Sequence, residues 1–129
     1  IDITMRGGLN EATVSQYSTD GRVVIETGDL SQVNIANVLQ EVTATGSSAR
    51  IEQSGWYGRT EITQRDSLGL GGGNEADVTQ AGYGSGSDAL LSLVTQDGAS
   101  NMARVAQDAS LALSTVAQSG TGHFVQVAQ

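Results

Sequence analysis

Glutamine recurs along this chain at a spacing that constrains the fold more than any other feature. Nine of the eleven glutamines close a seven-residue phrase of the form Asn/Ser-x-Ala-x-Val/Ile-x-Gln, with the clearest copies at residues 10–16, 34–40, 74–80 and 101–107. Period-two alternation over seven residues is typical of a β-strand. Recurrence of one phrase at regular spacing indicates a stacked array. The chain is therefore expected to be a repeat protein.

Two degenerate copies complete the series. Residues 21–27 carry Thr27 in the glutamine place, and residues 1–5 form a shortened copy that closes at Met5. Six of the ten intervals between closing positions are eleven residues long. A strand and a short turn then form half of a flattened coil of about 22 residues, and alternate strands form two facing sheets. We predict an all-β, parallel β-solenoid of about eleven short strands in roughly 5 to 5.5 coils, without helix, as one repeat domain over residues 1–129.

The four longer intervals place their extra residues between strands. Turn-prone stretches with extra residues are 28–31, 68–73 and 82–87. Glycine supplies positive φ angles, and Asp and Ser side chains bond to the local backbone. Because loops accept insertions and strands in register do not, we expect the longer turns to leave the register unchanged.

The period of two assigns each residue of a phrase to the interior or the exterior. The β-branched place is apolar in every copy, Ile3 included, which predicts a dry core seam. Its predicted members are Val14, Ile25, Val38, Ile51, Ile62, Val78, Val94, Val105, Val116 and Val127.

The closing glutamines share the inward parity. A buried amide without partners costs about 1 to 3 kcal/mol, and a ladder of like amides from coil to coil removes that cost. The predicted stacking ladder comprises the glutamines and the opening asparagines: Gln16, Gln40, Gln53, Gln64, Gln80, Gln96, Gln107, Gln118, Gln129, Asn10, Asn34, Asn74 and Asn101.

Most outward places hold charged or polar side chains, but one sheet also holds outward apolar residues. Contiguous exposed apolar surface usually marks a contact site. We expect this set to form an apolar stripe for lateral contact between filaments: Ile35, Leu39, Leu91, Leu93 and Leu113.

Composition excludes several functions. The net charge is -8 with six Arg and no Lys, so the electrostatic attraction that dominates nucleic-acid binding has the wrong sign. No apolar run approaches the length of a membrane span. Cysteine is absent, which excludes disulfides and thiolate metal sites. The start at Ile1, without an initiator Met, suggests a processed product and is compatible with export.

No motif predicts catalysis, a metal or a cofactor. The glycine-rich residues 68–74 lack the Gly-Lys-Ser/Thr ending of a phosphate loop. The Asp residues do not recur in the frame of a calcium-binding repeat. His123 is the only histidine, so neither a metal site nor a catalytic triad can be composed around it. We predict that the chain is not an enzyme.

The phrases with Ser or Asn at the opening place resemble the curlin repeat of bacterial curli fibres, written Ser-x5-Gln-x4-Asn-x5-Gln. The stretch Gln96-x4-Asn101-x5-Gln107 and the phrases 47–53 and 74–80 carry the resemblance. It implies a secreted, extracellular functional amyloid subunit that polymerises with itself in cell-surface fibres of a biofilm matrix and serves adhesion. It also implies partners in the form of secretion and nucleation accessory proteins.

The alternative is a soluble solenoid used for binding, such as an adhesin module or an ice-binding surface. Soluble solenoids need atypical terminal units, and edge strands are commonly blunted by Lys or Pro. This chain contains neither residue, and its last phrase ends in repeat register, which favours the fibre. With an odd number of strands, direct stacking leaves one sheet short of a strand at each junction. Either an upstream segment fills that gap, or residues 1–5 act as an adaptor.

Overall fold

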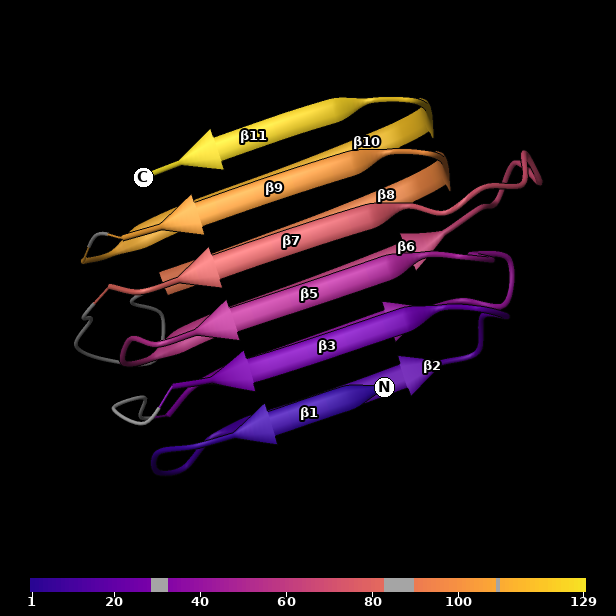
Figure 1. Ribbon diagram of the computed structural model, residues 1–129. Coiled ribbons are helices and arrows are strands. Elements are labelled where there is room, and N and C mark those ends of the chain that lie inside the picture. Colours follow the sequence, from indigo (N-terminus) through magenta and orange to yellow (C-terminus); the bar gives the residue numbers. More distant parts are fainter. Residues whose placement is uncertain (29–32, 83–89, 109) are drawn as a thin grey trace.

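The strands form two parallel sheets that face each other. The computed structural model describes residues 1–28, 33–82, 90–108 and 110–129. Figure 1 shows the odd-numbered strands side by side in one layer and the even-numbered strands in the layer behind. The six-stranded sheet contains β1 (Asp2–Met5), β3 (Arg22–Thr27), β5 (Ser48–Gln53), β7 (Glu75–Gln80), β9 (Met102–Gln107) and β11 (Phe124–Ala128). The five-stranded sheet contains β2 (Glu11–Gln16), β4 (Ile35–Gln40), β6 (Gly58–Arg65), β8 (Leu90–Ala99) and β10 (Ala112–Thr121).

This arrangement confirms the predicted fold class. Successive strands alternate between the sheets, every pairing is parallel, and none of the described residues forms a helix. Coil length varies as the intervals in the sequence predict. The coil from Ile3 to its partner Ile25 takes 22 residues (25 minus 3), whereas the coil from Ile62 to Val94 takes 32 (94 minus 62). The extra residues lie in the turns, so each strand keeps its register with its neighbours.

The core is a thin layer of β-branched and small side chains. The β-branched residue of each phrase stacks on that of the next coil, as Val38 does on Ile62 and Ile51 does on Val78. The places two residues earlier hold alanines such as Ala36 and Ala103, which are fully buried. Of the ten predicted seam residues, eight are buried, and Val14 and Val127 in the terminal coils are partly buried. A flattened coil has room for only one such layer between its sheets.

Glycine supplies the positive φ angle at eight of the described positions, as expected, but not at every corner. The residue directly before an opening position takes the left-handed conformation in most turns, and in six of them it is not glycine. The six are Leu9, Asp20, Val33, Tyr57, Ser100 and Leu111, with φ between 55° and 63°. A left-handed L-residue costs roughly 1 to 2 kcal/mol. Stacking of the coils therefore fixes a corner that local preference alone would not select.

Several glycines are required because backbones of successive coils approach closely. A Cβ on Gly55 would lie 1.9 Å from the carbonyl oxygen of Gly82, and a Cβ on Gly73 would lie 2.2 Å from that of Gly46. Neither Gly55 nor Gly73 has a positive φ. Of the predicted long turns, residues 29–31 and 83–87 lie outside the described residues, and residues 68–73 form a turn between β6 and β7.

Candidate functional site

The closing glutamines of the five-stranded sheet form a hydrogen-bonded ladder. Each Nε2 donates to the Oε1 of the glutamine one coil further along the chain. The donor–acceptor distances are 2.9 Å from Gln40 to Gln64, 3.0 Å from Gln64 to Gln96 and 2.9 Å from Gln96 to Gln118. All four side chains are buried. The amides thus connect four coils through the interior.

A second ladder runs through the six-stranded sheet. Gln53 donates to Gln80 and Gln80 to Gln107, both at 2.8 Å, and Gln107 donates to Gln129 at 3.2 Å. Both ladders have the same direction, with Nε2 toward the β10–β11 edge and Oε1 toward the β1–β2 edge. The two edges of the solenoid therefore differ chemically.

The second hydrogen of each amide binds the two sheets together. Gln64 Nε2 donates to the carbonyl of Asn74 (3.1 Å), and Gln96 Nε2 donates to that of Asn101 (3.0 Å). These carbonyls belong to opening residues in the facing sheet, on the other side of the turn. Gln64 reaches its acceptor across ten residues of chain and Gln96 across five. The same bond closes short and long turns, which explains why insertions leave the register intact.

Both ladders are incomplete at the β1–β2 edge. Thr27 takes the glutamine place in β3, and its Oγ1 donates to the carbonyl of Arg6 (2.9 Å). The next acceptor, Gln53 Oε1, is buried without a hydrogen-bond partner among the described residues. In the other sheet, Gln40 Oε1 accepts from Ser18 Oγ (3.3 Å), while Gln16 Nε2 donates to the carbonyl of Gly21.

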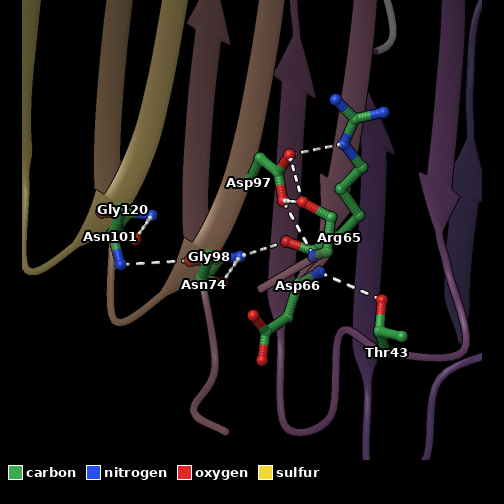
Figure 2. A network of polar contacts seen from close by, with 9 residues as sticks. Thr43, Arg65, Asp66, Asn74, Asp97, Gly98, Asn101 and Gly120 are labelled. Atoms are coloured by element: carbon green, nitrogen blue, oxygen red, sulfur yellow. Dashed lines mark hydrogen bonds and ion pairs between the residues drawn. The ribbon is translucent and has the colours of Figure 1, made fainter. Parts of the chain in front are cut away.

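The opening asparagines, which were predicted as members of the stacking ladder, do bond from coil to coil, but through backbone groups. Asn74 Oδ1 accepts the backbone N–H of Asn101 (3.1 Å), and Asn74 Nδ2 donates to the turn carbonyl of Gly98 (2.9 Å). Figure 2 shows this contact and the equivalent one from Asn101 to Gly120. The side chain of Asn is one methylene shorter than that of Gln, so its amide reaches the backbone at the strand entrance and not the next side chain. Asn10 and Asn34 accept in the same way, from the N–H groups of Asn34 and Gly58 respectively.

A polar network that the sequence patterns did not reveal fixes the turn between β6 and β7. The buried carboxylate of Asp66 accepts the backbone N–H groups of Leu70 (3.1 Å) and Gly71 (2.8 Å), and its own N–H donates to Thr43 Oγ1 (3.1 Å; Figure 2). Asp at the first position of a turn commonly accepts such bonds. An Asp directly after a long strand and before a glycine run is the signal that could have found it.

Asp97 binds the same turn from the neighbouring coil. Its carboxylate accepts from Ser67 Oγ (2.6 Å), Ser67 N–H (2.9 Å) and Arg65 Nε (3.0 Å). The hydrogen bonds from Ser67, first that of its side chain and then that of its backbone, hold the pKa of Asp97 below its ordinary value of 3.8, and Arg65 adds to the effect. The carboxylate therefore connects β6 to β8 in its charged form.

The predicted apolar stripe on the five-stranded sheet is interrupted. Arg59 of β6 lies between Ile35 of β4 and Leu91 of β8 in the register of the sheet. Arg59 also forms an ion pair with Glu61 on the same strand. Leu91 is directly paired with Leu113 of β10, and Leu93 lies on the same face. The five residues therefore form two patches: a β4 patch of Ile35 and Leu39, and a β8–β10 patch of Leu91, Leu93 and Leu113.

The edges of both sheets are open. β1 and β2 pair with one strand each at one end of the solenoid, and β10 and β11 pair with one strand each at the other. Figure 1 shows the N- and C-termini at these opposite ends. Both edges consequently carry backbone groups that can pair with a further strand.

The described residues contain no group of three or more His, Cys, Asp and Glu side chains placed to hold a metal ion. His123 is exposed, and its backbone N–H donates to Asn101 Oδ1 (3.0 Å). No helix long and apolar enough to cross a membrane occurs in the part of the chain that the structure describes. Comparison with protein-family models, curated proteins and solved structures finds no match for this chain.

Proposed function

We propose that this protein is a structural, non-catalytic subunit that polymerises with itself, head to tail, into a cross-β fibre. One observation carries the proposal. Two buried amide ladders run along an uncovered stack of parallel strands, and the bonds from glutamine to glutamine all point the same way. A structure that repeats along its axis and has no cap among its described strands can be extended by another copy.

The two ends are complementary. Gln118 and Gln129 present their amides at the β10–β11 edge, and Gln16 and the acceptor of Gln53 lie near the β1–β2 edge. Joining the edges of two copies continues the backbone hydrogen bonds and the Val/Ile seam in the same register. The terminal seam residues Val14 and Val127, which are partly buried in one copy, become covered in the stack.

The resemblance to the curlin repeat gives the proposal its biological setting. The fibre is extracellular and attached to the cell surface, it serves biofilm matrix and adhesion, and accessory proteins secrete and nucleate its subunits. The acidic composition, with a net charge of -8, keeps the chains apart in solution before assembly.

Electron microscopy and fibre diffraction of the purified protein test the proposal. Incubation should give unbranched fibres, preformed fragments should remove the lag, and aligned fibres should diffract at about 4.8 Å along the axis. A protein that stays monomeric in the presence of seeds would refute polymerisation and favour the soluble binding module. Ordered fibres without the axial reflection would refute head-to-tail stacking.

A further inference from the structure

We infer that β1 is a replaceable strand, and that in the polymer β11 of a neighbouring copy takes its place against β3. The partner surface is the edge formed by β3 and β2, and its occupant is the β10–β11 edge of a second copy. This inference rests on the proposed function, because it specifies the junction between two subunits.

β1 is the weakest strand of the solenoid. It has four residues, all of them exposed, and it pairs with β3 over those four residues only. Ile3 is 41% exposed although it occupies the seam place, whereas its partner Ile25 is fully buried. Met5 occupies the ladder place and is 48% exposed. Its thioether has no amide hydrogen to donate along the ladder.

β11 fits the same edge better. It pairs with β9 over five residues, its two seam residues Val125 and Val127 are already partly buried, and Gln129 follows in the ladder place. In the register of the sheet, β11 of a second copy would set Val127 on Ile25 and Gln129 beside Thr27. β11 thus brings the amide of Gln129 to the ladder place, where β1 has the apolar thioether of Met5.

The strand counts supply the reason for replacement. The described residues form sheets of six and five strands. When a second copy of residues 1–129 is added by translation along the axis, with its β2 on β10 of the first copy, its β1 comes to the place that β11 already occupies. In this arrangement, β1 of the second copy or β11 of the first copy must leave the sheet. The five-stranded sheet then continues without interruption, with Gln118 of one copy beside Gln16 of the next.

Rotation offers the other solution. If the second copy turns by half a revolution about the axis, its β1 lies on β10 and its β2 lies on β11, and both strands stay in place. The two solutions put different residues side by side. Replacement places Gln126 beside Val24. Both residues directly precede the seam residue of their strand, and in the register of the sheet Gln126 pairs with Arg104 and Val24 with Asp2. Rotation places Gln126 beside Thr13, which is the corresponding outward residue of β2.

Disulfide trapping distinguishes these junctions, since the chain has no cysteine of its own. Neighbouring strands lie about 4.8 Å apart, within the usual Cα separation of a disulfide. Equal amounts of Gln126→Cys and Val24→Cys chains should be co-polymerised under reducing conditions and then oxidised. We expect a mixed disulfide dimer on denaturing gels. Each variant polymerised alone is the control for random pairing.

The outcomes separate this inference from the proposed function. If a mixture of Gln126→Cys and Thr13→Cys chains cross-links in fibres and the mixture with Val24→Cys does not, the rotated junction is correct and replacement is overturned. Fibres in which neither pair cross-links also overturn it. Absence of fibres from the unmodified protein would instead refute polymerisation itself.

Growth rates give a second test that needs no cysteine. Met5→Gln provides β1 with an amide at the ladder place, so it should hold β1 more tightly and slow seeded elongation by about fivefold, the factor of one hydrogen bond. Thr4→Gln, on the exposed outward side of the same strand, is the matched control and should elongate at the wild-type rate. Deleting residues 1–5 should accelerate elongation. Unchanged rates in both Met5→Gln and the deletion would overturn replacement.

Discussion

At the scale of single residues, glutamine and asparagine carry out different tasks with the same chemical group. Gln80 accepts from one coil, donates to the next, and donates to the backbone of the facing sheet. Among the described residues, the side chain of Asn74 forms hydrogen bonds only with backbone groups, at the strand entrance and in the turns. A side chain one methylene longer thus determines whether an amide can join a ladder.

Removing one ladder amide should destabilise the protein more than removing an outward charge. Gln107→Ala leaves Gln80 without its acceptor and Gln129 without its donor, and should cost about 1 to 3 kcal/mol. It should also slow seeded elongation. Denaturant titration and seeded growth measure the two effects.

Arg104→Ala is the matched control for this change, because Arg104 lies three residues away on the exposed side of the same strand. It should stay within about 0.5 kcal/mol of wild type. Equal stability of the two variants would contradict the stabilising role of the ladder.

Acid should weaken the contact between β6 and β8. The pKa of Asp97 is lowered in the folded protein, first by the Ser67 side chain, then by the Ser67 backbone and Arg65. The folded state therefore binds this proton less readily than the unfolded state. The stability contributed by Asp97 is fully present above its ordinary pKa of 3.8 and is lost as the pH falls through the lower folded value.

The comparison with Asp97→Asn isolates this contribution from the other carboxylates. Wild type should be more stable than Asp97→Asn at neutral pH, and the difference should diminish below pH 3.8. Denaturant midpoints along an acid series measure it. A difference that is independent of pH would show that the charge of Asp97 contributes nothing.

Periodicity in the sequence predicted much at this scale, but not all of it. The period of two placed Gln40 and Gln96 on the inward side, and the structure brings both into one ladder. The direction of the ladder and the backbone contacts of asparagine depend on the length of the side chains and on the stagger of the strands. The spacing of residues in the sequence does not specify either property. The Thr27 interruption is visible in the sequence, whereas the unpaired acceptor of Gln53 is a feature of the folded structure.

At the scale of elements, six corners of the turns are determined by stacking and not by local preference. Leu9, Val33 and Leu111 adopt left-handed corners that sequence preference assigns to glycine. The strands, in contrast, follow the seven-residue phrase closely, since alternation and burial agree there. Strand positions were therefore predictable, and turn conformations depended on the neighbouring coil.

Substitution of a stacked glycine should be severe even without positive φ. Gly55→Ala would place its Cβ 1.9 Å from the carbonyl oxygen of Gly82 and should cost about 3 kcal/mol. Thermal or denaturant unfolding measures the loss.

Gly8→Ala is the control for a turn glycine with space around it, because nothing lies within 4 Å of the added Cβ. It should be close to neutral. If both glycine variants unfold at the same denaturant concentration, close approach of the coils is not the constraint on Gly55.

At the scale of the whole molecule, the charged side chains near β8 on the outer face of the five-stranded sheet form ion pairs. On the five-stranded sheet near β8, Arg59 pairs with Glu61, and Arg65 with Asp97, so the charges around the β8–β10 patch balance. An acidic chain can approach another copy there with little repulsion. The predicted apolar stripe is not continuous, because Arg59 lies on the strand between Ile35 and Leu91. Arg59 precedes the inward Gln64 by an odd number of residues, so the sequence already indicated that its side chain faces outward.

We expect the β8–β10 patch to mediate lateral bundling of filaments. The double change Leu91→Ser and Leu93→Ser should give dispersed single fibres with unchanged elongation, since both side chains point outward from the ladder and seam. Bundle width in electron micrographs is the measurement.

The β4 patch provides the control. Ile35→Ser with Leu39→Ser alters two apolar residues on the same sheet, beyond Arg59, and should leave bundling as in wild type. Bundling that is lost in the β4 variant and retained in the β8 variant would move the lateral contact to β4.

The common direction of the two amide ladders has an electrical consequence. Backbone dipoles in a sheet largely cancel, but the glutamine amides joined in the two ladders all have Nε2 toward the β10–β11 edge and Oε1 toward the β1–β2 edge. Each amide carries a moment of about 3.5 D, and head-to-tail stacking adds these moments over the length of a fibre. Such a filament is a permanent macroscopic dipole, which an external electric field would align with one particular end forward.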